Sequence, residues 1–447
     1  MDRYQYVEVP TKWLGTLPSH WDNKKIGELF SERRTKVSDK DYAPLSVAKA
    51  GVVPQLDTAV KTDAGDNRKL VCSGDFVINS RSDRKGSCGV SEMDGSVSLI
   101  NIVLTPRNEW NKRYVHYLMR SQPFSEEYYR HGRGIVADLW TTRFSEMKNI
   151  ILPIPPRDEQ DGMVAFLDWK VSGINRLINI KKKEVKNVLA LKHSMVSDAV
   201  IHGVNPNVPM KYSGVKWLGD IPAHWTMIKL RQLLSPVSVK NHPELPLLSV
   251  TREQGVIVRN VESKEENHNY IPDDLSGYKV VRKGQFAMNK MKAWQGSYGI
   301  SDYTGIVSPA YFIFDVNFEN LEYFHFAIRS KVYVNFFAQA SDGIRVGQWD
   351  LQMDKMKEIP FIIPPAEEQI AIVEHVRAAM PKYDALIEKL QEEIKALEEY
   401  KAKLIADVVT GKIDVRNVEI PDYEFEEELG ETEDTDDDED DASDEEV

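Results

Sequence analysis

The stretch KWLGTLPSHW, from Lys12 to Trp21, recurs as KWLGDIPAHW from Lys216 to Trp225. Seven of the ten positions are identical, including both tryptophans, the proline and the histidine. A phrase that returns after 204 residues in a chain of 447 residues indicates that the sequence is written twice. This repetition decides the fold class, because each half must then build a similar module.

Further matched phrases follow in the same order in both halves, at offsets between 203 and 210 residues. They are PLSV (44–47) and LLSV (247–250), GSCGVS (86–91) and GSYGIS (296–301), YVHYLMRS (114–121) and YFHFAIRS (323–330), and IPPRDEQ (154–160) and IPPAEEQ (363–369). Such a period is far longer than that of a solenoid repeat. The sequence therefore predicts a tandem duplication with pseudo-two-fold symmetry.

Each half divides into a mixed module and a long helix. Short β-branched or aromatic runs such as DFVINS, VSLINIVL, QFAMNK and PAYFIFDV alternate with turn-forming residues, which is typical of strands. Helices are expected over 112–130 and 319–338. Because a double proline favours a helix start behind it, long helices are expected after Pro156 and Pro365.

Both long helices carry heptad seams, with apolar positions separated by alternating steps of four and three residues. The seams run through 167, 171, 174, 178, 181, 185, 188, 192, 195 and 199, and through 383, 387, 390, 394, 397, 401, 404 and 408. A helix of about 44 residues is roughly 65 Å long, and one narrow seam needs a partner. The predicted fold class is α+β: two mixed α/β modules joined by two long helices in an antiparallel coiled coil.

The predicted boundaries follow from these phrases. They are a first module over 1–156, a helix over 157–203, a linker over 204–213, a second module over 214–365, a helix over 366–412, and an acidic, disordered tail over 413–447. The four tryptophans of the repeated phrase, Trp13, Trp21, Trp217 and Trp225, are expected to be apolar anchors at the entry to each module.

The net charge of −13 hides an uneven distribution. Residues 422–447 contain 17 acidic residues and no Lys or Arg, so the first 421 residues carry 57 basic against 53 acidic side chains. The body is therefore slightly basic, and the tail either solubilises the chain or mimics DNA. Cys72 and Cys88 form no CxxC pair, and no apolar run is long enough for a membrane span or signal peptide, which predicts a cytoplasmic protein.

Catalytic signatures are missing from the sequence. It has no GxxxxGK[ST], GxGxxG, GxSxG or HExxH motif and no Asn-Pro-Pro-aromatic tetrapeptide. Its histidines are scattered, and His20 and His224 are expected to be packed rather than to bind metal. We therefore expect a non-catalytic binding protein without a metal or cofactor of its own.

Basic residues at matching turns indicate where such a protein binds DNA. Two pairs of turns share their flanking residues but differ in the residues between those flanks. The first pair is NSRSDRKGS (79–87) and NKMKAWQGS (289–297), and the second is RGIVADLWTTR (133–143) and DGIRVGQWDLQ (342–352). Lys and Arg contact phosphates, and Arg, Asn and Gln also read base edges; an ordinary solvated turn is the alternative. With the segments 32–36 and 238–242, the candidate residues are Arg33, Arg34, Lys36, Arg81, Arg84, Lys85, Arg133, Arg143, Lys240, Asn241, Lys290, Lys292, Trp294, Arg345 and Gln348.

A duplicated module that opens with W-L-G-x-[IL]-P-x-H-W and closes with I-P-P-x-x-E-Q before a heptad helix resembles the specificity subunits of type I restriction-modification systems. The resemblance extends from residue 1 to about 415. It implies two target recognition domains that read a bipartite, asymmetric sequence in double-stranded DNA, with the helices as a ruler for the gap. The acidic tail is not part of the family pattern.

The resemblance also implies partners. Two methyltransferase subunits would carry S-adenosylmethionine, and restriction subunits would use ATP and Mg²⁺, while this chain would scaffold both through its helices in the bacterial or archaeal cytoplasm, on the nucleoid. Three alternatives stay open: a specificity component of a related phage-defence or solitary methylation system, a self-contained DNA-modifying enzyme with an unrecognised site, and a purely architectural coiled-coil protein.

Overall fold

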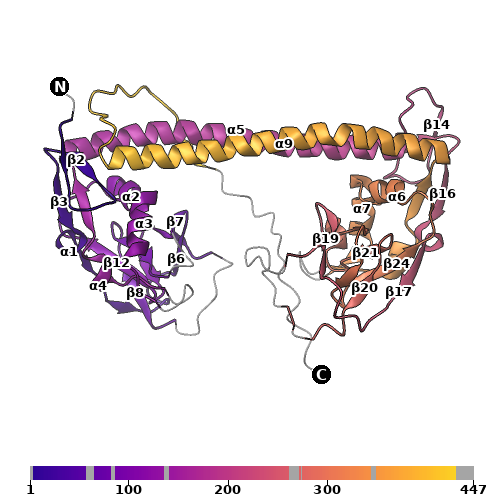
Figure 1. The fold of residues 1–447 in the computed structure, drawn as a ribbon, viewed down its shortest axis with the longest axis horizontal. Helices are drawn as coiled ribbons and strands as arrows, with labels where there is room; N and C mark the ends of the chain where they lie inside the picture. The colour runs from indigo at the N-terminus through magenta and orange to yellow at the C-terminus, as the bar shows by residue number, and fades with distance from the viewer. Residues whose placement is uncertain are drawn as a thin grey trace. The chain divides into compact units, whose positions relative to one another are not determined.

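The computed structural model describes residues 4–56, 65–81, 86–134, 140–260, 271–272, 274–343 and 349–428. These residues divide into two compact units, each containing one module and part of each long helix (Figure 1). Unit 1 lies within 1–182 and 392–430, and the described part of unit 2 lies within 183–391. Four candidate site residues fall outside the described ranges: Arg84, Lys85, Arg345 and Gln348.

The first module is built on a four-stranded antiparallel sheet in the order β10-β9-β12-β4 and a three-stranded sheet in the order β11-β8-β5. Its elements are β1 (Tyr6–Glu8), β2 (Thr16–Pro18), β3 (Asp22–Lys25), α1 (Ile26–Leu29), β4 (Phe30–Glu32), β5 (Lys36–Val37), β6 (Leu45–Ala48), β7 (Gly51–Pro54), β8 (Arg68–Val71), β9 (Phe76–Asn79), β10 (Cys88–Val90), β11 (Gly95–Val97), β12 (Asn101–Pro106), α2 (Lys112–Arg120), α3 (Gln122–Arg130), α4 (Phe144–Met147) and β13 (Ile151–Ile154). VSLINIVL therefore spans two strands, β11 and β12, rather than one.

The second module repeats this plan, with a four-stranded sheet in the order β17-β24-β21-β22. Its elements are β14 (Met210–Tyr212), β15 (Asp220–Pro222), β16 (Thr226–Lys229), η3 (Leu230–Gln232), β17 (Leu234–Val237), β18 (Leu248–Thr251), β19 (Gly255–Val258), β20 (Lys279–Val281), β21 (Phe286–Met288), η4 (Ala293–Gln295), β22 (Tyr298–Ile300), β23 (Gly305–Val307), β24 (Phe312–Val316), α6 (Leu321–Ile328), α7 (Lys331–Gln339), β25 (Ser341–Asp342), β26 (Asp350–Leu351), α8 (Met353–Lys357) and β27 (Pro360–Ile363).

The long helices are α5 (Arg157–His202) and α9 (Ala366–Val409), and both begin directly after the double prolines. They run antiparallel, since in unit 1 Lys181 pairs with Glu393 at 2.9 Å and Asn175 with Lys401 at 3.2 Å. Every predicted seam position is partly or fully buried. The predicted α+β fold with an antiparallel coiled coil is confirmed.

Three expectations about local structure were wrong. The proposed linker contains β14, which pairs with β15 just as β1 pairs with β2, so the second module begins before residue 214. The helix expected over 112–130 is two helices, because Ser121 is extended (ψ 148°) and caps α2 by donating to the Leu118 carbonyl at 2.7 Å. Ser330, also extended (ψ 152°), lies between α6 and α7, so the helix expected over 319–338 is likewise two helices, although the Ser330 hydroxyl makes no such cap bond to the described residues.

Candidate nucleic-acid interface

The two predicted recognition loops of the first module lie against each other. Thr141 forms β-bridges with both Arg81 and Arg133, and the Thr142 amide donates to the Ser80 carbonyl at 3.0 Å. The backbone of one loop therefore holds the other, although about 50 residues separate them in the sequence. Arg81 and Arg143 are exposed, and Arg133 is 84% exposed with Glu146 4.0 Å away.

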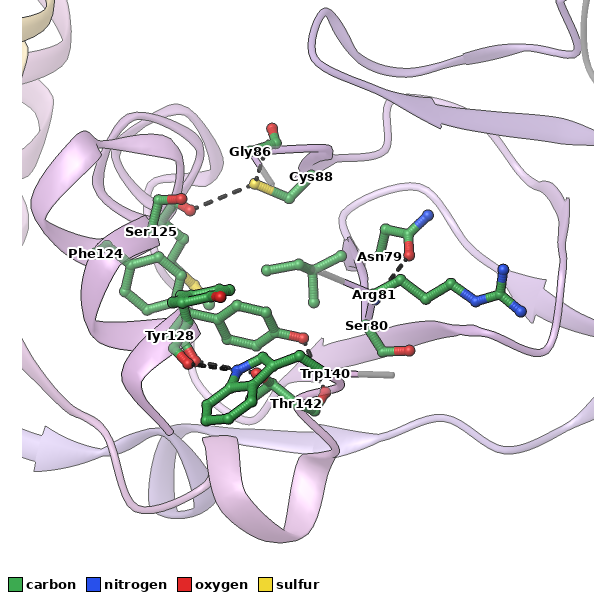
Figure 2. Close-up of a pocket in the computed structure, with 13 residues that line it drawn as sticks. Asn79, Ser80, Arg81, Gly86, Cys88, Phe124, Ser125, Tyr128, Trp140 and Thr142 are labelled. Carbon is green, nitrogen blue, oxygen red and sulfur yellow. Dashed lines mark hydrogen bonds between the residues drawn. The ribbon is translucent and has the colours of Figure 1, made fainter. Parts of the chain in front are cut away.

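Aromatic residues of α3 support this loop pair. Tyr129 stacks on Trp140 with ring centroids 5.6 Å apart, and the Trp140 indole donates to the Tyr129 carbonyl at 3.0 Å. Beneath them, the Tyr128 hydroxyl donates to the Thr142 carbonyl at 3.0 Å. Figure 2 shows the rings of Tyr128 and Trp140 on one side of a small pocket and the Arg81 side chain extending away from them. The loops thus present a cation beside a partly exposed aromatic pair.

The second module has the same loop arrangement with different side chains. The Leu351 amide donates to the Lys290 carbonyl at 3.1 Å, and Lys290 Nζ lies 3.3 Å from Asp350. Trp294 packs on Trp349 with ring centroids 5.1 Å apart. Lys292 is half-buried at the start of η4. Corresponding backbone contacts therefore hold loops that carry Arg side chains in the first module and Lys and Trp side chains in the second.

The segment 32–36 has a more internal role than expected. The Arg33 guanidinium forms a two-pronged ion pair with the buried Asp75, at 2.8 and 3.1 Å, and the bond to Asp75 raises the pKa of Arg33. Arg34 is exposed but bonded to Glu32 at 2.8 Å, whereas Lys36 is exposed on β5. The Arg33 side chain therefore stabilises the first module through its ion pair with Asp75.

Two lysines that sequence reasoning missed occupy equivalent positions in the modules. Lys69 donates to the Asn101 carbonyl and Lys279 to the Tyr311 carbonyl, both at 2.7 Å. Burial lowers the pKa of both, and Lys240 and Lys290 lower the pKa of Lys279 further. They lie within strands, where no turn signal identifies them. The charges of two candidate segments, through Lys240 and Lys290, therefore act on Lys279.

Asn241 is held in a left-handed conformation (φ 66°), and its amide donates to the Ser276 carbonyl at 3.1 Å. Both Asn241 and Lys240 are exposed. Guanidinium, ammonium and amide groups on paired loops can contact phosphates and base edges. Within the described ranges, no group of three His, Cys, Asp or Glu side chains is arranged to hold a metal ion.

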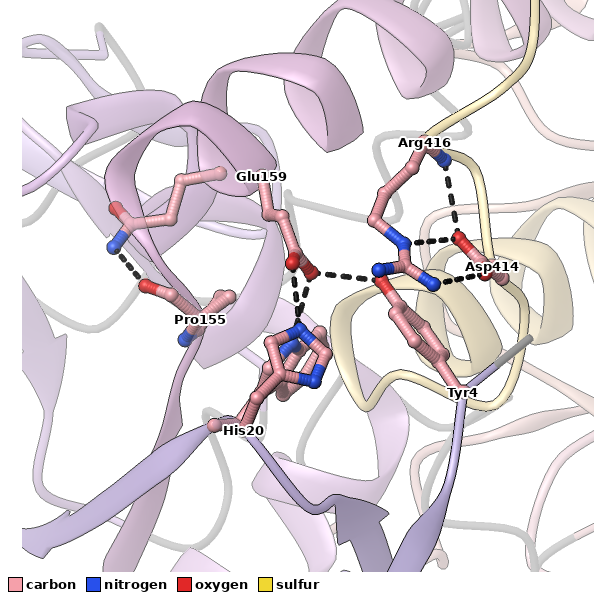
Figure 3. Close-up of polar contacts among 8 residues, drawn as sticks. Tyr4, His20, Pro155, Glu159, Asp414 and Arg416 are labelled. Atoms are coloured by element: carbon pink, nitrogen blue, oxygen red, sulfur yellow. Dashed lines mark hydrogen bonds and ion pairs between the residues drawn. The ribbon is translucent and has the colours of Figure 1, made fainter. Parts of the chain in front are cut away.

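The repeated entry phrases 12–21 and 216–225 serve a different purpose. The Trp21 indole donates to Glu159 at 2.9 Å, and His20 Nε2 lies 2.6 Å from the same carboxylate, to which the Tyr4 hydroxyl also donates (Figure 3). In unit 2, Trp225 and His224 contact Glu368 in the same way, at 2.9 and 2.5 Å. Each phrase therefore fixes its module to the start of the following helix.

The expectation that all four tryptophans are buried anchors was wrong for Trp217. Its side chain is 56% exposed, whereas Trp21 and Trp225 are 5% and 1% exposed. Trp13 is partly buried and packs edge-on against Phe124. The anchoring tryptophan is thus the second one of each phrase, because only its indole reaches the helix carboxylate.

No known protein-family model matches this chain. It is 25% identical over 430 residues to the type I restriction enzyme MjaVIII specificity subunit of Methanocaldococcus jannaschii, across 90% of this chain and 95% of that one. It is 21% identical to the "Putative type I restriction enzyme MjaX specificity subunit" of the same organism, with coverages of 90% and 96%. The resemblance found from the repeated phrases is therefore confirmed over nearly the whole length.

Solved structures agree with the fold. A chain from a structure that describes complex assembly and conformational transition of the type I R-M system aligns with a TM-score of 0.55 at 12% identity. The alignment covers 89% of this chain and 99% of that one. The likeness therefore includes both modules and both long helices.

Proposed function

We propose that this chain, which resembles type I restriction-modification specificity subunits over 90% of its length, reads a bipartite, asymmetric DNA sequence as the specificity subunit of such a complex. Each module reads one part of the target. The single observation that carries this proposal is the pair of matched loops, with the same backbone frame but different side chains in the two modules. Two different readers on one chain need no palindromic target.

The helix pair gives the gap between the two target parts a geometric length. A coiled coil is stiff compared with a loop linker, and each base pair advances the duplex by about 3.4 Å. The helices also offer a long surface on which methyltransferase subunits, two in number, and restriction subunits assemble. These partners carry S-adenosylmethionine, ATP and Mg²⁺, and this chain carries out no chemistry itself.

The experiment that tests this function is adenine methylation mapping. The chain is expressed with a type I methyltransferase subunit from the same source, in a host without its own adenine methylation, and methylated motifs are sequenced. We expect one asymmetric motif with a fixed, unread gap. A continuous or palindromic motif contradicts the assignment of two different readers.

The self-contained enzyme is tested in parallel. The purified chain alone is incubated with DNA and labelled S-adenosylmethionine, and no methyl transfer is expected until the methyltransferase subunit is added. Transfer by the chain alone replaces the proposal with the alternative of an unrecognised catalytic site. DNA binding without sequence preference favours an architectural role instead.

A further inference from the structure

The first part of the acidic tail is bound to α5 in unit 1. Residues 413–447 were expected to be disordered, but the structure describes 413–428, and residues within 424–428 form hydrogen bonds with side chains of α5. Phe425 lies beneath the Arg113 guanidinium, 5.5 Å from its carbon. The prediction of disorder was therefore wrong for 413–428; residues 429–447 lie outside the described ranges.

Three polar side chains of α5 hold the backbone of this segment. Ser172 Oγ donates to the Glu424 carbonyl at 2.9 Å and accepts from the Glu426 amide at 2.7 Å. Asn175 and Asn179 donate to the carbonyls of Glu426 and Glu427 at 3.1 and 3.0 Å. The three are 2%, 7% and 7% exposed. Hydrogen bonds to the main chain fix the backbone of the bound peptide in an extended form. Diffuse attraction between charges does not fix a backbone conformation.

Two lysines form ion pairs with the last residue of the segment. Glu428 accepts a hydrogen bond from Lys182 at 2.9 Å and another from Lys401 of α9. Burial alone would raise the pKa of Glu428, but the bonds from the two lysines outweigh it and lower this pKa. Ser172, Asn175, Asn179 and Lys182 recur at steps of three, four and three residues, so they share one face of α5. With Lys401 they form what we call the acidic-segment site.

The same face is absent from the other half of the chain. The IPPRDEQ and IPPAEEQ phrases fix an offset of 209 residues between the two halves. At this offset, the α9 residues equivalent to the four α5 residues are Pro381, Asp384, Glu388 and Gln391. In unit 2, Lys192 pairs with Asp384 at 2.5 Å. In unit 1 its equivalent, Lys401, meets the neutral Asn175. Its charge is therefore balanced by Glu428 instead of by the helix pair.

We propose that the acidic-segment site is a recognition site for an extended acidic peptide, and that Tyr423–Glu428 is its resident ligand. Individually weak contacts suffice to hold this segment on α5, because it belongs to the same chain and therefore binds at a high effective concentration. Residues 431–447, with 12 further acidic residues, follow after Leu429 and Gly430 in the sequence. The site thus fixes the point on the helix pair from which this polyanionic run starts, and does so independently of DNA recognition.

The test is limited proteolysis of the full chain with a glutamyl endopeptidase, with cleavage after Glu424 and Glu426 followed by mass spectrometry. The free peptide 421–428 gives the unprotected rate. We expect the wild-type chain to be cut at least about tenfold more slowly than the peptide. The double variant Asn175→Asp, Asn179→Glu gives unit 1 the residues of unit 2, and is expected to be cut at nearly the peptide rate.

The matched control is Asp384→Asn, which changes the equivalent position in unit 2 and is expected to leave the wild-type rate unchanged. Glu428→Lys repeats the test without altering a helix, so a folding defect of the double variant does not decide the outcome. Cleavage of the wild-type chain at the peptide rate overturns the proposal. So does wild-type protection that survives in both Glu428→Lys and the double variant, or that disappears in roughly 0.5 M salt, where only charge attraction is screened.

Discussion

The hydroxyl of Tyr114 donates a hydrogen bond to the carbonyl oxygen of Val409 at 3.1 Å, although Val409 ends the helix that follows the other module. The equivalent Tyr323 donates to the Val200 carbonyl at 3.3 Å, at the end of α5. Each module is therefore seated on the start of its own helix and the end of the other one. Each compact unit therefore combines one module and the start of its own long helix with the end of the other long helix, whereas each sequence repeat contains one module and the whole of its own helix.

Removing the Tyr114 hydroxyl should weaken unit 1. Because Tyr114 is fully buried, Tyr114→Phe leaves a carbonyl at the end of α9 without this donor, and we expect a loss of about 1–2 kcal/mol in unfolding free energy. Urea unfolding measures it. Tyr42→Phe, at an exposed tyrosine, is the control. Equal effects of the two changes would contradict the role assigned to Tyr114.

The two tryptophans of the second entry phrase should differ sharply. Trp225→Ala removes a buried ring and its bond to Glu368, so a loss of about 3–5 kcal/mol is expected. Trp217→Ala removes a largely exposed ring and should cost under about 1 kcal/mol. Thermal unfolding of the two variants checks this order, and a reversed order would refute it.

Acid should destabilise both modules through equivalent histidines. Burial, with Arg120 and Arg113 nearby, lowers the pKa of His116 to about 3, and burial with Arg329 lowers that of His325 to about 4. Unfolded imidazoles titrate near 6.5, so below that pH the unfolded chain binds more protons. The stability that neutral His116 and His325 contribute is complete above about pH 6.5. It is lost as the pH falls toward 4, by up to about 1.4 kcal/mol per histidine and pH unit.

Urea unfolding at several pH values between 7.5 and 4.5 measures this loss. The double variant His116→Gln, His325→Gln keeps a polar acceptor that does not titrate, so its stability should fall less steeply with acid than that of the wild type. Identical slopes would show that other groups, such as paired carboxylates, account for the acid sensitivity.

Arg81→Ala should relax recognition in one part of the DNA target. Arg81 is exposed on the paired loops of the first module, and loss of a base contact costs about 1–3 kcal/mol, or roughly 5- to 150-fold in affinity. Binding to a panel of single-base variants of the methylation motif measures it. The half-site read by the second module is the internal control. A uniform loss across all sequences would instead assign Arg81 to a phosphate.

Lengthening both helices should change the preferred gap. Four extra residues in each of α5 and α9 extend the pair by about 6 Å, which is close to two base pairs. Methylation mapping of this variant should show the same two half-sites with a longer gap. An unchanged motif would mean that the helix pair does not set the spacing.

Local sequence patterns account for much of the fold. The matched phrases reveal the duplication, and the double prolines locate the starts of α5 and α9 to the residue. The heptad seams identify the buried stripe. Matched flanks with different contents identify the two loops of each module, although not that these loops lie against each other in the folded chain. These features depend on neighbours in sequence or on a helical repeat, which the sequence states directly.

Only the tertiary structure decided which distant groups meet. Nothing in the spacing of Arg33 predicts its buried partner Asp75, and nothing near Trp217 and Trp225 shows which ring faces Glu368. The acidic tail reads as disordered from its composition, since like charges repel. Three polar residues of α5, about 250 positions away, hold its first part because they supply hydrogen-bond partners for its backbone. Charge and periodicity are properties of the sequence, whereas a partner for a particular side chain exists only once the chain is folded.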